Sequence, residues 1–96
     1  MIRHTVVFRL KHAKGSPEEK AFLAAAKALA KIPGVEKFEQ LRQVSRKNDY
    51  TFGFSMEFGN QALYDGYNDH PDHVAFVRDL WMKEVEAFLE IDYEAL

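Results

Sequence analysis

The residues best suited to chemistry lie between Tyr67 and His73, where the sequence reads Tyr-Asn-Asp-His-Pro-Asp-His. Proline is tolerated in the first turn of a helix, and it pushes the residue before it towards extended geometry. We therefore expect His70 to cap a helix, Pro71 to begin it and His73 to occupy its third position. An imidazole there is partly buried and near the positive end of the helix dipole, and both effects disfavour its charged form. His73 is thus a candidate general base.

The helix that begins at Pro71 is predicted to run to about Phe88, because apolar residues recur at helical spacing along it. This stripe consists of Phe76, Val77, Leu80, Trp81, Val85 and Phe88. The same residues also suit a structural helix start, in which His70 caps backbone amides and His73 packs at the edge of the core. If His70 is the cap, only one good metal ligand remains on the helix face, so no metal site is predicted.

The length and composition predict one folded domain over residues 1–96, because 47% of the residues are hydrophobic and eight of them are Phe. The absence of cysteine excludes disulfides and thiolate catalysis. A net charge of −2 implies no general affinity for nucleic acid or anionic membranes. No stretch resembles a signal peptide or reaches membrane-spanning length, so a cytoplasmic protein is expected.

The predicted order of the main elements is strand, helix, strand, strand, helix, strand. Residues 2–10 alternate as a half-buried strand, and Ser16-Pro17-Glu18-Glu19 forms a capping box that opens a helix. The expected elements are a strand at 2–10, a helix at 17–32, a weaker strand at 36–44, a turn at 45–49, a strand at 50–58, a short helix at 60–67, a helix at 71–88 and a strand at 89–93. This order is typical of the α+β, ferredoxin-like split βαβ fold, with helices on one face of a four-stranded antiparallel sheet.

The two faces of the first strand differ in character. Ile2, Val6 and Phe8 share one face with His4, which is interpreted either as a core-edge histidine with a hydrogen-bond partner or as a ligand contact. The other face carries polar residues around Val7 and could meet water or a second subunit. A small core rich in aromatic residues often gains stability from pairing with another copy. His12 is expected to be a solvated surface residue.

Three stretches resemble the stress-responsive dimeric α/β-barrel (Dabb) family. They are His4-Thr5-Val6-Val7-Phe8, Tyr50-Thr51-Phe52 and, most specifically, the Tyr-x-x-His-Pro-x-His-x-x-Phe run from Tyr67 to Phe76. The resemblance implies a homodimer that joins two sheets into a barrel. One branch is similar to plant stress proteins with a stabilising, non-enzymatic role. Another contains olivetolic acid cyclase. The resemblance of this chain to that enzyme implies that His73 is a general base, that the Tyr67 hydroxyl assists it, and that His4 matches the histidine on the first strand.

A small apolar cleft that takes a small carbonyl or aromatic compound is therefore expected between sheet and helices. Its predicted lining is His4, Phe8, Phe54, Tyr67, His73 and Trp81. A stress-stabilising structural protein remains the alternative, and a haem-degrading or quinone-forming monooxygenase-like barrel is a lesser one. An RNA-recognition domain is not expected, because no Lys or Arg opens the aromatic strand over residues 52–58. No cofactor is predicted.

Overall fold

Four strands form a single antiparallel sheet in the computed structural model, which describes all 96 residues. The strands are β1 (Ile2–Leu10), β2 (Glu36–Arg42), β3 (Phe52–Phe58) and β4 (Val85–Tyr93). Their spatial order is β2-β3-β1-β4, and every neighbouring pair is antiparallel. The two central strands are thus the ones with the cleanest alternation in the sequence.

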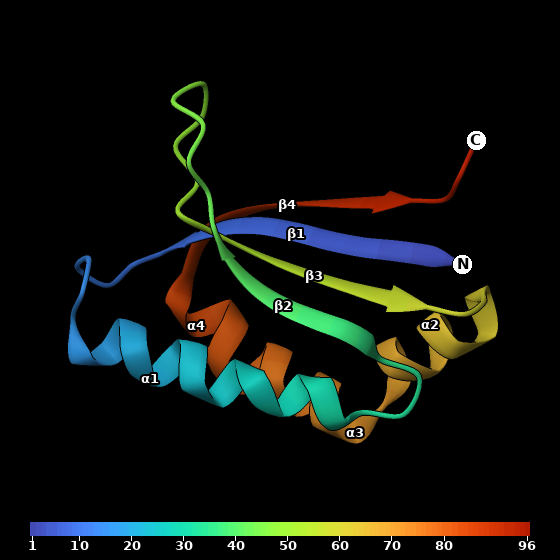
Figure 1. The fold of residues 1–96 in the computed structure, drawn as a ribbon. Coiled ribbons are helices and arrows are strands. Elements are labelled where there is room, and N and C mark those ends of the chain that lie inside the picture. The colour runs from blue at the N-terminus through green and yellow to red at the C-terminus, as the bar shows by residue number, and fades with distance from the viewer.

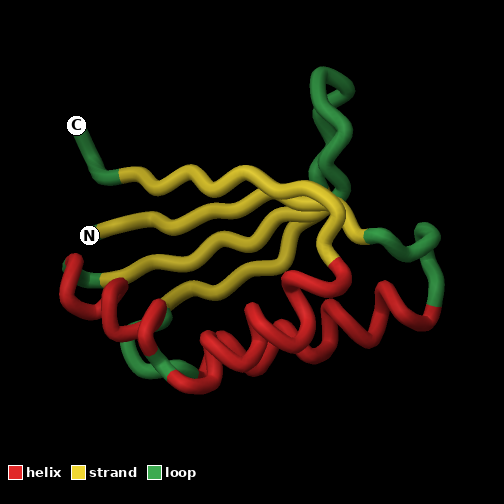
Figure 2. Tube along the Cα trace, turned by 180° about the vertical axis from the view of Figure 1, so that it is seen from behind, coloured by secondary structure: helices red, strands yellow, loops and turns green.

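The helices cover one face of this sheet and leave the other face open (Figure 1, Figure 2). They are α1 (Pro17–Ala26) with its 3₁₀ continuation η1 (Lys27–Lys31), α2 (Gln61–Asp69), α3 (Pro71–Phe76), the π-helical turn η2 (Val77–Trp81) and α4 (Met82–Glu84). The predicted ferredoxin-like α+β arrangement is confirmed. No helix is both long enough and apolar enough to span a membrane.

Side-chain caps fix where the helices begin. The hydroxyl of Ser16 accepts a hydrogen bond from the Glu19 amide at 3.2 Å, ahead of Pro17. The ring of His70 accepts one from the Asp72 amide at 3.1 Å, ahead of Pro71. Both starts follow the sequence prediction, because each cap satisfies an amide that has no partner inside its helix.

The last helix ends earlier than predicted. It stops at Glu84, and β4 begins at Val85, so Val85 and Phe88 belong to a strand. β4 pairs with β1 from Arg3 to Leu10, and this ladder of backbone hydrogen bonds replaces one further helical turn. Both residues still lie on the helix-facing side of the sheet: Val85 is buried, and Phe88, which is half exposed, meets the ring of Trp81 edge-on at 5.5 Å. The spacing of Val85 and Phe88 in the sequence thus fits a helix, although both residues lie in a strand.

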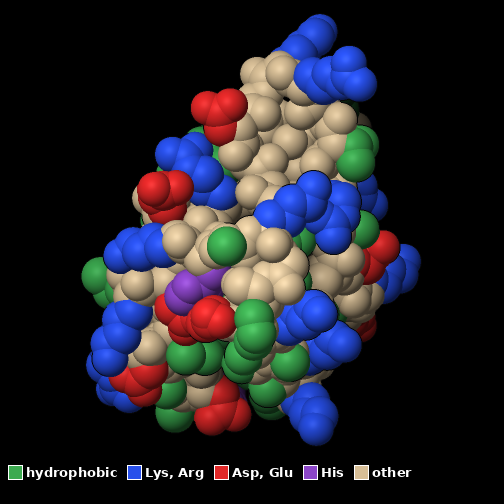
Figure 3. Space-filling model, turned by 90° about the vertical axis from the view of Figure 1, so that its left-hand side faces the viewer, with side chains coloured by type: hydrophobic (Ala, Val, Ile, Leu, Met, Phe, Trp, Pro, Cys, Tyr) green, Lys and Arg blue, Asp and Glu red, His purple; other side chains and the backbone are tan.

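The hairpin between β2 and β3 is longer than predicted, since β2 ends at Arg42 and β3 begins at Phe52. The loop rises on the side of the sheet away from the helices (Figure 1). Lys and Arg side chains gather at its tip (Figure 3). His12 also departs from expectation. It is half-buried, with its Nε2 2.7 Å from a carboxylate oxygen of Glu84, so it ties the loop after β1 to the end of α4.

β4 places three apolar side chains on the open face of the sheet. Leu89 lies opposite Val7, Ile91 opposite Thr5 and Tyr93 opposite Arg3, so the apolar half of this strand is on the open face. These three side chains are 40–54% exposed. Phe88, Glu90 and Asp92 point towards the helices instead. The open face is therefore less polar than the alternation of the first and third strands predicted.

The core lies between the sheet and the helices, and Phe8 is at its centre. Phe8 is fully buried, and its ring lies 4.7 Å from that of Phe54, 5.0 Å from that of Trp81 and 5.8 Å from that of Phe22. Such rings contribute both buried apolar area and favourable edge contacts.

Replacing Phe8 with alanine is expected to lower the free energy of unfolding by about 3–5 kcal/mol, because it empties the middle of this cluster. Chemical denaturation at one fixed protein concentration measures the loss. Val74→Ala, at a 46% exposed position on α3, is the matched control and should change stability by less than about 0.5 kcal/mol. Equal effects of the two substitutions would contradict the placement of Phe8.

Candidate functional site

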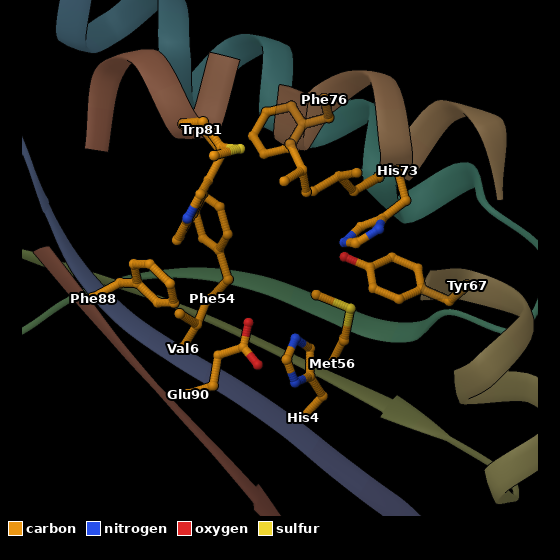
Figure 4. A pocket seen from close by; sticks show the side chains of 13 residues that line it. His4, Val6, Phe54, Met56, Tyr67, His73, Phe76, Trp81, Phe88 and Glu90 are labelled. Carbon is orange, nitrogen blue, oxygen red and sulfur yellow. The ribbon is translucent and has the colours of Figure 1, made fainter. Parts of the chain in front are cut away.

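A cavity of about 340 Å³ lies between the helix-facing side of the sheet and the chain from α2 to α4 (Figure 4). Ten of its 13 lining residues are hydrophobic. The lining consists of His4, Val6, Leu29, Phe54, Met56, Tyr67, His73, Phe76, Val77, Trp81, Met82, Phe88 and Glu90. A volume at the low end of the range for ligand pockets suits a small, mainly apolar molecule.

His73 enters this cavity from the first turn of α3. Its Nδ1 lies 3.1 Å from the backbone carbonyl oxygen of Asn68. A carbonyl can only accept, so Nδ1 carries the proton and Nε2 is left with its lone pair. Burial lowers the pKa of His73 from its ordinary value of 6.5, and the Asn68 hydrogen bond opposes this shift. The imidazole is therefore uncharged near neutral pH and has one nitrogen free to take a proton.

Tyr67 lies beside His73, with 4.4 Å between the ring centroids. Only 2% of Tyr67 is exposed, and burial raises the pKa of its phenol well above the usual value, with a smaller contribution from the negative charge of Glu90. The hydroxyl makes no hydrogen bond within the chain, and it points past the His73 ring into the cavity (Figure 4). It thus remains a protonated donor available to a bound oxygen.

His4 forms a network that the sequence did not indicate. Its Nδ1 lies 2.6 Å from one carboxylate oxygen of Asp92 and 2.9 Å from the Tyr64 hydroxyl. Tyr64 also donates to the other Asp92 oxygen at 2.8 Å. His4 therefore has the core-edge partner that was one of its two interpretations, and it lines the cavity as well. The available signal was the alternation of β4, which places Asp92 opposite His4 once the two strands pair.

Five of the six predicted cleft residues meet at the cavity: His4, Phe54, Tyr67, His73 and Trp81. Phe8 does not line it, because Phe54 and Trp81 cover its ring. Sequence reasoning missed Glu90, which reaches the cavity from β4, and Met82, which follows the π-helical turn. The binding and catalytic roles of the five residues remain predictions.

The model of the family described as the stress responsive A/B barrel domain (Dabb) matches residues 2–95. The chain belongs to this family. Comparison with the curated proteins finds no match.

Among solved structures, a Dabb family protein with a ferredoxin-like fold from Mesorhizobium loti is 70% identical, with a TM-score of 0.97 over 99% of this chain and 96% of that one. A dimeric protein of unknown function from Bacteroides fragilis is 23% identical, with a TM-score of 0.73 over 98% and 95% of the two chains. A hydroxynitrile lyase from Passiflora edulis is 17% identical, with a TM-score of 0.85 over 99% and 93%. The last two share the fold of this Dabb domain.

The two histidines of the His-Pro-x-His run in this Dabb domain point in different directions. His70 turns its ring to the backbone as a helix cap, while His73 faces the cavity. No group of three His, Asp or Glu side chains is arranged so that it could hold a metal ion. The titratable side chains at the cavity are an uncharged imidazole, a protonated phenol, a carboxylate-bound histidine and the carboxylate of Glu90.

His73 is expected to titrate below 6.5 when its ring protons are followed by NMR, because burial disfavours the imidazolium. The unfolded chain then binds the proton more readily than the folded one. The stability that His73 contributes is thus present above the unfolded pKa and is lost as the pH falls towards the folded pKa.

Unfolding free energies of the wild type and His73→Gln, compared from about pH 8 to about pH 5, measure this effect. The wild type should lose more stability on acidification than the variant. The His73→Gln spectrum also identifies the His73 signals. A midpoint at or above 6.5 would contradict the buried, uncharged ring.

Proposed function

We propose that this Dabb domain binds a small carbonyl compound in the cavity and removes a proton from the carbon next to the carbonyl. His73 acts as the base and Tyr67 as the hydrogen-bond donor to the oxygen. The observation that carries this proposal is the pairing of an uncharged imidazole with a protonated phenol, 4.4 Å apart by ring centroids, at a cavity of about 340 Å³. The resemblance of the Tyr67–Phe76 run to the olivetolic acid cyclase branch supports the same roles.

The proposed step moves one proton and one electron pair. The C–H bond breaks, the proton passes to Nε2 of His73, and the electron pair delocalises onto the carbonyl oxygen as an enolate. The Tyr67 hydroxyl donates a hydrogen bond to this oxygen as its charge develops. The enolate carbon then either takes the proton back or attacks a second carbonyl of the same molecule, as in an aldol ring closure. In the second case the C=O π bond breaks as the C–C bond forms, and the resulting alkoxide takes the proton from Nε2 of His73, which restores the base. A positioned base of suitable pKa contributes about 10²–10⁴-fold to such a step.

The surroundings of the pair favour this chemistry. The cavity wall is mainly apolar, so a ligand that covers it would exclude water from the Tyr67 hydroxyl and the His73 lone pair. Asp92 and Tyr64 hold His4 in one orientation on the neighbouring wall. The Passiflora edulis lyase indicates that the fold can support an enzyme, while the activity of this chain rests on its own residues.

Exchange of the methyl protons of acetophenone in heavy water tests the proposal. The wild-type protein should accelerate exchange, and His73→Gln should lower that acceleration by about 10²-fold or more. Tyr67→Phe should lower it by a smaller factor while the ketone still binds. The rate should fall as the pH drops below the His73 pKa, because the base must be uncharged.

Glu18→Gln, on the exposed start of α1, should leave the exchange rate unchanged. If the wild type neither accelerates exchange nor binds ketones, and His73→Gln is simply less stable, the proposal is wrong. The stress-stabilising structural role would then be the better account of the fold.

We also propose that two copies pair through their open sheet faces. A barrel requires a closed sheet, and the four strands of one chain form an open one. Two such sheets supply eight strands, a number whose interior side chains can fill. The apolar row of Leu89, Ile91 and Tyr93 offers the surface, and the Bacteroides fragilis relative is described as dimeric.

Leu89→Lys combined with Ile91→Lys should convert the dimer to a monomer, because two ammonium groups would have to be buried between the sheets. Sedimentation velocity at micromolar concentration measures the change. Val74→Lys, which adds a charge at a similarly exposed position on the helical side, should leave the dimer intact. A wild-type protein that sediments as a monomer would rule out this pairing.

A further inference from the structure

From Phe88 onwards, three side chains of β4 point towards the helices, and two of them have partners in the protein. The ring of Phe88 packs edge-on against Trp81, 5.5 Å away. The carboxylate of Asp92 is held by His4 at 2.6 Å and by Tyr64 at 2.8 Å. Glu90 lies between them in the strand, opposite Val6, at a solvent-exposed position on the cavity wall, and makes no hydrogen bond or ion pair with any other side chain.

The carboxylate of Glu90 points into the cavity between Phe88 and His4 (Figure 4). Tyr67 and His73 stand on the far side of the same space (Figure 4). No lysine or arginine lines the cavity, so nothing in the wall neutralises this charge. Its negative potential reaches the reacting groups, since it raises the pKa of Tyr67 and opposes the lowering of that of His73.

A ligand that fills the cavity must displace water from this carboxylate. A carboxylate that loses water without gaining a partner is costly, and a second carboxylate beside it would also be repelled. A hydroxyl or protonated amine restores the lost hydrogen bond, and charge-assisted hydrogen bonds are stronger than neutral ones. Apart from His4, whose Nδ1 is bound to Asp92, the wall near that end of the ligand is apolar.

We propose that Glu90 is a specificity-determining residue. It selects carbonyl compounds that carry a hydrogen-bond donor, such as a hydroxyl or protonated amine, at the end remote from the carbonyl, and it rejects those that carry a carboxylate there. This inference rests on the proposed function, because the carbonyl must lie at Tyr67 and His73 for the remote end to meet Glu90. The substrate class is thus a donor-bearing ketone or aldehyde with an apolar middle.

Four acetophenones that differ only in the para substituent test the proposal: methyl, hydroxymethyl, aminomethyl and carboxylate. Dissociation constants are measured by NMR titration at one salt concentration for the wild type and for Glu90→Gln. The wild type should bind the aminomethyl compound about tenfold more tightly than the methyl compound, and the carboxylate most weakly. In Glu90→Gln the aminomethyl compound should lose about tenfold, the carboxylate should gain, and the methyl compound should stay within about twofold.

Glu86→Gln is the matched control, since it removes the same charge from another exposed position of β4, where the carboxylate pairs with Arg9 outside the cavity. It should leave the order of affinities unchanged. An identical order in the wild type and Glu90→Gln, with the methyl compound bound by both, would overturn the role of Glu90 while the proposed function stands. Failure of all four compounds to bind the wild type would overturn the proposed function, and this inference with it.

Discussion

The pairing of β4 with β1 is the constraint on which the rest of the structure depends. Its register sets Asp92 opposite His4 and Glu90 opposite Val6, so two carboxylates face the helices. Asp92 is accommodated because His4 and Tyr64 satisfy its oxygens. A shift by one residue would turn these carboxylates to the open face and bring Leu89 and Ile91 inward, because side chains alternate along a strand. The cavity would then lose its polar wall.

This register explains why the space beside the core is not filled. Phe8, Phe22 and Phe54 pack closely at one end of the sheet, where Trp81 closes over them. Towards the other end, polar side chains occupy positions that Leu or Phe would take in a solid core. Of these, His4 is buried and is hydrogen-bonded to Asp92 and Tyr64, as a buried polar group must be, while Glu90 and Asp92 stand at exposed positions of β4. Tyr67 and His73 therefore face an opening that the sheet itself creates, and the helix start at Pro71 sets their spacing.

The sequence predicted the fold well because its signals are local. The alternation of β1 and the caps at Ser16 and His70 are each contained in a few residues, and the structure confirms them. The end of the last helix was wrong because Trp81, Val85 and Phe88 satisfy helical spacing and strand packing alike. Asp92 and Tyr64 could not be assigned to His4, since 88 and 60 residues separate the partners. The register of β4 on β1 brings Asp92 to His4, and the packing of α2 against the sheet brings Tyr64 there.

The proposed function and the role of Glu90 both require a carbonyl compound bound between Tyr67 and His73. The most direct measurement is the set of nuclear Overhauser effects from the ¹³C-labelled methyl group of bound acetophenone to the protein. The account predicts contacts to the ring protons of Tyr67 and His73, together with Phe54 or Trp81 around the aromatic ring. Contacts confined to Leu89, Ile91 and Tyr93 on the open face, or no contacts at saturating ketone, would contradict it.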